Sequence, residues 1–191
     1  MPYKIGIFGS AVVESDEVVD RAKRLATALV PTQAILITGS CSGLPYAIAY
    51  EAAQQGVEVW GFSPKQNEHD QRQWVPHDDI TIYKNMVYVP PNFPFAHNDQ
   101  VCRKYRNVIS TAHCDAGIIV AGRWGTLNEF TNLVDMGKVV GVLTETGGIA
   151  DELPGLFQRI RKETSSVVVF NSNPEQLVHS LMVELGKRSP R

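Results

Sequence analysis

The stretch AGIIVAGRWGTLNEF, residues 116–130, runs from an apolar segment through a glycine-containing turn into a helical pattern. Its first part, AGIIV (116–120), has no polar side chain, which is typical of a strand covered on both faces in a parallel sheet. Gly122 and Gly125 then allow a tight turn and let a ligand approach the backbone closely. This strand–turn–helix unit predicts an α/β fold, and the remainder of the chain repeats it.

Short apolar runs alternate with helical patterns along the whole chain. Strands are predicted at 4–8, 34–38, 57–62, 116–120, 139–143 and 167–170, with a β-rich segment at 80–89. Helices are predicted at 14–29, 43–55, 98–113, 125–136, 149–163 and 174–186. The alternation predicts a doubly wound, Rossmann-like three-layer sandwich with a mostly parallel sheet of about seven strands. We expect one nucleotide-binding domain over residues 1–186 and a flexible tail at 187–191.

Residues 63–79 interrupt this alternation. They are polar and show no periodicity, so we predict a long loop between the third strand and the segment that follows. Trp74 in this loop is open to two interpretations, a platform on which a base stacks or an anchor of the loop. The sequence favours the anchor.

The composition bounds the class of protein. The chain has 191 residues, of which 43% are hydrophobic, and a formal net charge of -2. Because a protein that binds nucleic-acid backbones is usually basic, nucleic acid is not an expected partner. No apolar run approaches the roughly 18 residues of a membrane span, and no signal-peptide pattern begins the chain. Three cysteines without CxxC spacing fit a cytoplasmic protein with no metal site.

Three loops rich in small residues follow predicted strands. In doubly wound sheets, ligands bind outside the carboxyl ends of the strands near the point where the strand order reverses. The residues of these loops that we expect to bind a nucleotide or phosphate are Gly9, Ser10, Gly39, Ser40, Gly43, Gly122, Arg123, Gly125 and Thr126. Neither GxGxxG nor GxxxxGK[ST] is present, so a dinucleotide site of the usual kind and a P-loop are not expected.

Two further features have alternative interpretations. Thr126 and Glu129 either contact a ligand at the helix start or form a capping box, since T-x-x-E is that pattern. Arg106 and Asn107 lie in the helix predicted at 98–113, where Arg103 can share their face. That face either meets a phosphate or ribose, or is a solvated surface with ordinary ion pairs.

The chain resembles the LONELY GUY (LOG) family of phosphoribohydrolases, often labelled lysine decarboxylase-like, and the wider group that includes DprA/Smf. The family signature PGGxGTxxE corresponds to AGRWGTLNE at 121–129, and Arg106 stands 23 residues before Glu129, as the family's arginine does. FGS (8–10) and the segment at 37–64 resemble the family's first two glycine loops. TETGGIADEL (144–153) resembles a nucleotide-binding branch near LOG.

The resemblance implies hydrolysis of the N-glycosidic bond of a nucleoside 5′-monophosphate, which gives a free base and ribose 5-phosphate. It implies Arg106 and Glu129 as catalytic residues, no required cofactor, a bound nucleotide monophosphate or phosphate, and a homodimer. Asn107 stands where LOG proteins commonly have a lysine, and we expect it among the binding residues because it shares the helix face of Arg106. Lysine decarboxylation is not expected, because no lysine lies in a pyridoxal-phosphate motif.

Two departures from the signature keep a second function open. Ala121 replaces its proline and Arg123 replaces its second glycine. A bulky cation in that turn either adds a contact to a phosphate or blocks the family's ligand pose. The alternative is therefore a non-catalytic binding or carrier protein for a nucleotide or a nucleotide-like phosphorylated cofactor, such as the molybdenum cofactor.

Overall fold

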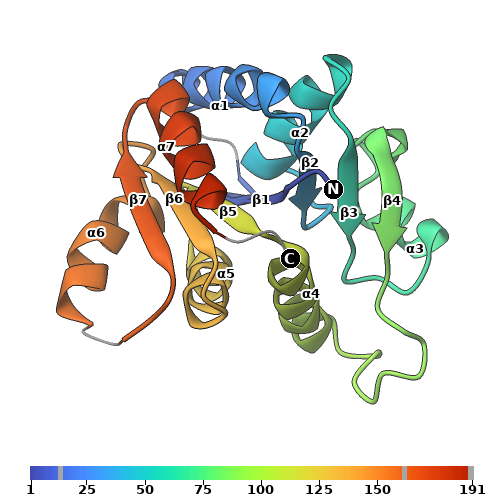
Figure 1. The fold of residues 1–191 in the computed structure, drawn as a ribbon. Helices are drawn as coiled ribbons and strands as arrows, with labels where there is room; N and C mark the ends of the chain where they lie inside the picture. Colours follow the sequence, from blue (N-terminus) through green and yellow to red (C-terminus); the bar gives the residue numbers. More distant parts are fainter. Residues whose placement is uncertain (13–14, 161–162, 189–191) are drawn as a thin grey trace.

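The apolar runs form the middle layer of the molecule (Figure 1). The computed structural model describes residues 1–12, 15–160 and 163–188, and in these residues seven parallel strands have the order β4-β3-β2-β1-β5-β6-β7. The strands are β1 (Lys4–Gly9), β2 (Ile35–Thr38), β3 (Val59–Phe62), β4 (Tyr83–Val87), β5 (Ala116–Val120), β6 (Val139–Leu143) and β7 (Val167–Asn171). The predicted fold class is confirmed.

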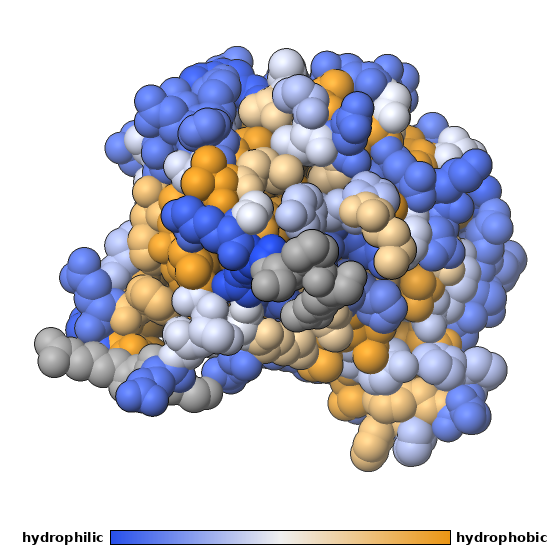
Figure 2. All heavy atoms as spheres, in the orientation of Figure 1, coloured by the Kyte–Doolittle hydropathy of each residue, from blue (hydrophilic) through white to orange (hydrophobic). Residues whose placement is uncertain are grey.

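Helices cover both faces of the sheet, as side-chain alternation along the strands requires (Figure 1). One layer consists of α1 (Asp16–Leu29), α2 (Leu44–Gln54) and α7 (Pro174–Gly186), and the other contains α4 (Asp99–His113), α5 (Trp124–Asp135) and α6 (Ile149–Arg159). Ile5 and Ile7 of β1 belong to the core under the first layer, while Phe8 belongs to the core under the second. The outer surface of α1, at the top of Figure 2, is hydrophilic.

The strand order reverses beside β1. Strands β2, β3 and β4 extend from one side of β1, and β5, β6 and β7 extend from the other. Gly9 pairs with Val120 at the ends of β1 and β5, and a Cβ at Gly9 would lie 2.3 Å from the Val120 carbonyl oxygen. Because the connections leave these two ends in opposite directions, they open a crevice there.

The expectation of an unstructured loop at 63–79 is wrong in its centre. Residues Glu68–Trp74 form helix α3, and the Asn67 side chain caps its start by accepting a 2.9 Å hydrogen bond from the Asp70 N–H. The helix is too short for an apolar period, and its one buried residue, Gln71, is polar. Hydrophobic periodicity therefore carries no signal for this element, whereas the capping asparagine does.

Smaller differences concern element ends. The β-rich segment 80–89 contains a 3₁₀ turn, η2 (Ile80–Ile82), before β4. The helix predicted at 149–163 ends at Arg159, and its positions 161–162, like position 14 of the first predicted helix, lie outside the described residues. In the predicted tail, Arg188 donates hydrogen bonds to the Gly137 and Ser165 carbonyls. Positions 189–191 lie outside the described residues.

Candidate functional site

A cavity of about 340 Å³ lies at the carboxyl ends of β1, β2 and β5, where the strand order reverses. The predicted site residues that line it are Gly9, Gly39, Arg106, Asn107, Gly125, Thr126 and Glu129. They come from the ends of β1 and β2 and from α4 and α5, and a single crevice brings them together. Its position agrees with the rule for doubly wound sheets.

Gly39 and Arg106 are in direct contact in this cavity. A Cβ at Gly39 would lie 1.3 Å from Nη1 of Arg106, so the guanidinium lies where any side chain at 39 would begin. The backbone of Gly39 does not have a positive φ, so close approach is the reason for glycine here. Arg106 is only 9% exposed.

The guanidinium of Arg106 has no polar partner among the described residues. Its Nε is buried without a hydrogen bond, and neither a hydrogen bond nor an ion pair joins its other nitrogens to any residue that the structure describes. Leaving a buried cation unpaired is costly, and the cost is removed when an anion binds. An open cation of this kind is suited to a phosphate or carboxylate from outside the chain.

Glu129 lines the same cavity from α5. Burial raises the pKa of its carboxyl to about 7, and the Arg106 and Lys104 cations oppose this shift. No direct ion pair joins Arg106 and Glu129, and the Glu129 carboxylate accepts no hydrogen bond from the part of the chain that the structure describes. The site therefore holds a carboxyl that changes charge near neutral pH beside a permanently charged guanidinium.

The start of α5 does not form the capping box. Helix α5 begins at Trp124, so Thr126 lies within its first turn, and its Oγ1 donates to the Gly9 carbonyl at 3.2 Å. Nothing lies within 4 Å of the position that a Cβ would take at Gly125, which lines the cavity. The N–H groups of this first turn lack acceptors within the helix and can bind an anion.

Asn107 connects the two helices that carry Arg106 and Glu129. Its Nδ2 donates to Oδ1 of Asn128 at 3.1 Å and to the Gly125 carbonyl at 3.4 Å, while its Oδ1 is buried without a partner. This link sets the position of α4 against the first turn of α5. Asn107 thus holds the walls of the cavity as well as lining it.

Five predicted residues lie outside the cavity lining: Ser10, Ser40, Gly43, Gly122 and Arg123. Ser10 and Gly43 are packed together, since the Ser10 carbonyl accepts from the Leu44 N–H and a Cβ at Gly43 would lie 2.3 Å from that oxygen. The Ser40 hydroxyl points to the Met86 sulfur at 3.7 Å. These residues shape the loops around the cavity.

The altered signature turn contacts the start of α6. Gly122 has a φ of 94°, and its carbonyl accepts from the Ile149 N–H. The Arg123 side chain is exposed and does not line the cavity, so it does not obstruct it. The replacement of the signature glycine by arginine therefore leaves this crevice open.

Sequence reasoning missed part of the lining. Lys104 of α4 and Gln100 at its start, which the sequence did not single out, line the cavity, as do Arg103 and Trp74, which it had considered as ligand contacts. The lining thus contains three cations from α4, Arg103, Lys104 and Arg106, and one carboxylate, that of Glu129. The local charge is therefore positive, although the net charge of the chain is -2. In the sequence, the basic run RKYR at 103–106 could have indicated this local positive charge.

Other features of the described residues concern metals and membranes. Among residues 1–12, 15–160 and 163–188, no group of three or more His, Cys, Asp or Glu side chains is placed to hold a metal ion. The His113 ring packs against the Phe62 ring at a tilt of 54°, and Asp115 accepts a hydrogen bond from the Lys4 N–H at 2.8 Å. In the same ranges, no helix has the length and apolar character needed to cross a bilayer.

The chain belongs to the SLOG cluster4 family, whose model matches residues 2–178. The resemblance to LOG proteins is therefore confirmed at the level of the wider SLOG group, and the match does not single out LOG itself. Among curated proteins, none matches the chain.

Solved structures show the same fold. The chain is 17% identical to TM1055, a structural genomics target, with 96% of this chain and 99% of that one covered and a TM-score of 0.74. It is 16% identical to the molybdenum cofactor binding protein of the phototrophic bacterium Rippkaea orientalis, with 97% and 98% covered and a TM-score of 0.68. DNA processing protein A from Helicobacter pylori is 15% identical, with 96% and 81% covered and a TM-score of 0.66.

The exclusion of nucleic acid as a partner is wrong. The Helicobacter pylori protein of this fold is described as having a single-stranded DNA binding mode. The fold is thus compatible with a nucleic-acid partner. The physical reason is that net charge averages over the whole surface, whereas Arg103, Lys104 and Arg106 of α4 lie together around the cavity at the carboxyl ends of the strands.

The raised pKa of Glu129 predicts a pH-dependent stability. Because the folded protein holds this proton more tightly than the unfolded chain, the contribution is complete below pH 4.5 and is lost as pH rises through about 7. Glu129→Gln removes the dependence. The unfolding free energy of the variant minus that of the wild type should therefore rise by up to about 3 kcal/mol from pH 5 to pH 8. Denaturant unfolding at both pH values measures this.

The matched control is Glu152→Gln, which alters an exposed carboxylate in the first turn of α6. Its stability difference from the wild type should be the same at pH 5 and pH 8. If Glu129→Gln also shows a constant difference, Glu129 does not titrate near neutral pH in the folded protein.

Proposed function

We propose that this protein binds a nucleotide-like phosphorylated small molecule in the cavity at the ends of β1, β2 and β5, and holds it without chemical change. The observation that carries the proposal is the buried, unpartnered guanidinium of Arg106. A phosphate seated against it, at the first turn of α5, supplies the missing anion. The cavity of about 340 Å³ is of the size that small-molecule sites have.

The charges of the cavity also support this class of ligand. Arg103, Lys104 and Arg106 provide three cations, and the Glu129 carboxyl is partly protonated near neutral pH. A dianionic phosphate ester compensates the excess positive charge of the cavity, whereas a neutral metabolite leaves that charge uncompensated. The Rippkaea orientalis protein, which shares the fold, is named for binding the molybdenum cofactor. A phosphorylated pterin is therefore included among the candidates beside nucleoside monophosphates.

The first test is the affinity for AMP and GMP, measured by calorimetry on the wild type and on Arg106→Gln. Charged hydrogen bonds are worth enough that affinity should fall at least about tenfold in the variant. Unfolding free energy should stay equal or rise, because the variant no longer buries an unpaired charge. Arg159→Gln, on the exposed end of α6, is the control and should bind like the wild type.

Two outcomes would contradict the proposal. Unchanged affinity in Arg106→Gln would show that the guanidinium does not meet the phosphate. A large loss of stability in that variant would show that Arg106 serves the fold instead.

A second candidate is the phosphoribohydrolase reaction that the LOG resemblance implies. The observation that favours it is the position of Glu129, which lines the cavity beside Arg106 with no hydrogen-bond partner among the described residues. An ionised Glu129 would stabilise the positive charge that develops on the ribose as the glycosidic bond breaks, or orient the attacking water. Arg106 would hold the phosphate and favour the ionised form.

This candidate predicts that the wild type releases free base from at least one nucleoside monophosphate and that Glu129→Gln does not. AMP, GMP, CMP and UMP are incubated separately and analysed by chromatography. Glu152→Gln should behave like the wild type. If no base appears with any substrate, although the wild type binds one of them, the protein is a carrier in the sense proposed above.

A further inference from the structure

Trp74, the last residue of α3, lies between two cavities. It lines the cavity that contains Arg106 and Glu129, and it also lines a second cavity of about 340 Å³. The second cavity is bounded by Lys65 and Gln66, which follow β3, and by Ala96 and Asp99 near the start of α4. The half-buried indole is thus presented to both spaces.

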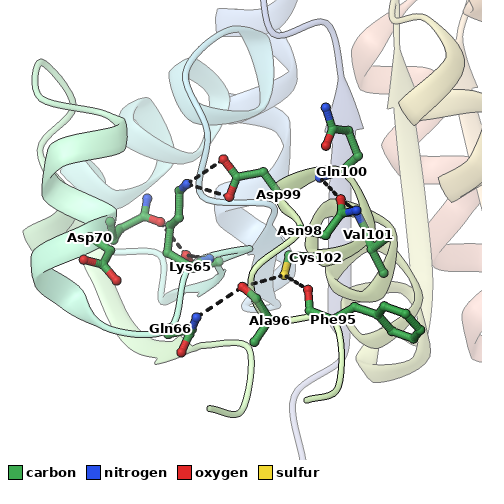
Figure 3. A network of polar contacts seen from close by, with 12 residues as sticks. Lys65, Gln66, Asp70, Phe95, Ala96, Asn98, Asp99, Gln100, Val101 and Cys102 are labelled. Atoms are coloured by element: carbon green, nitrogen blue, oxygen red, sulfur yellow. Dashed lines mark hydrogen bonds and ion pairs between the residues drawn. The ribbon is translucent and has the colours of Figure 1, made fainter. Parts of the chain in front are cut away.

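A network of polar contacts, drawn in Figure 3, joins the walls of the second cavity, which Trp74 also lines. Lys65 Nζ contacts both Asp99 carboxylate oxygens, at 3.0 and 3.2 Å, and Gln66 Nε2 donates to the Ala96 carbonyl at 3.2 Å. Figure 3 shows Lys65 reaching from the segment after β3 to Asp99, the first residue of α4, and Gln66 reaching to Ala96 just before that helix. Gln71, one turn before Trp74, is tied to the Ser40 carbonyl at 2.7 Å. The indole therefore packs against the main hydrophobic core on one side, while the part of it that stays accessible lines the two cavities.

Two cations lie over the indole ring. Lys65 Nζ and Arg103 Cζ are each 5.7 Å from a ring centroid of Trp74. Lys65 is paired with Asp99, but Arg103 is exposed and has no ion pair among the described residues. A planar ring can take the place of Arg103 on the indole, and the guanidinium can then cover the outer face of that ring, since guanidinium groups stack on aromatic planes.

We propose that Trp74 is the platform on which the heterocycle of the ligand stacks, and that it selects a fused two-ring system such as a purine or pterin. This rests on the proposed function, because the phosphate of the same ligand is placed against Arg106. Both residues line one cavity, so a single ligand touches both. The exposed amide of Gln100, in the same lining, meets the polar edge of the ring.

The physical reason for the selectivity is the area over which the heterocycle of the ligand overlaps the indole. Stacking of a base on an aromatic side chain is worth roughly ten- to a hundredfold in affinity and depends little on the pattern of donors and acceptors. A two-ring heterocycle covers more of an indole than a single pyrimidine ring does. Anchoring, the role that the sequence favoured for Trp74, explains why the indole packs against the core, but not why it also lines two cavities and carries two cations over its ring.

The experiment compares ligands that share the phosphate but differ in the ring. Calorimetry gives the affinities of the wild type, Trp74→Phe and Trp74→Leu for GMP, CMP, a pterin phosphate and ribose 5-phosphate. We expect Trp74→Leu to lose about tenfold or more for GMP or the pterin phosphate, and Trp74→Phe to lose less. Affinity for ribose 5-phosphate, which has no ring to stack, should be unchanged in both variants.

The outcomes separate this inference from the proposed function. If the wild type binds none of the four ligands, both fail. If ribose 5-phosphate and GMP bind equally well and Trp74→Leu changes neither, the phosphate site stands and the platform is wrong. If Trp74→Leu weakens all ligands equally, Trp74 is an anchor of α3, and the platform is again wrong.

A spectroscopic control assigns the contact to this tryptophan. Stacking quenches indole fluorescence, and the chain has two other tryptophans, Trp60 and Trp124. The quench on adding GMP should persist in Trp60→Phe and Trp124→Phe and disappear in Trp74→Phe. A quench that survives in Trp74→Phe would contradict the proposal. Comparison of the calorimetric affinities for GMP and for the pterin phosphate shows which two-ring system the site prefers.

Discussion

The contact between the Gly39 backbone and the Arg106 guanidinium is the constraint on which the candidate site depends. A strand end without a side chain leaves room for a guanidinium that arrives from α4. Among the described residues that guanidinium is buried without a polar partner, which costs free energy in the absence of an anion. The surrounding loops and the first turn of α5 complete the space into which the cation opens. Binding an anion is the function that this arrangement favours energetically.

The sequence predicted the sheet and its helices well because their signals are local. Apolar runs such as AGIIV and the helical stripe of residues 98–113 each identify an element without knowledge of its neighbours. Hydrophobic periodicity did not reveal helix α3, because its buried side, Gln71, is polar. The position of this helix decides where Trp74 lies, so the missed helix also concealed part of the lining of the cavity.

The structure brings together those predicted site residues whose side chains or backbone reach the crevice from strand ends and helix faces. Gly39, Arg106 and Glu129 meet there, although they are far apart in the chain. Ser40 lies outside the cavity lining and its hydroxyl turns to Met86, a direction that a loop sequence does not show. The net charge of the chain did not reveal the charge of the cavity, because a sum over all residues does not show that α4 places three cations beside it.

The measurement that tests the central claim most directly is the affinity of Gly39→Ala for ribose 5-phosphate. The added methyl would displace the Arg106 guanidinium without straining the backbone at position 39. We expect at least about a tenfold loss of affinity with an unchanged circular dichroism spectrum, while Gly186→Ala, where nothing lies within 4 Å, binds like the wild type. Wild-type affinity in Gly39→Ala would contradict the account, because the phosphate would then not depend on the position of Arg106.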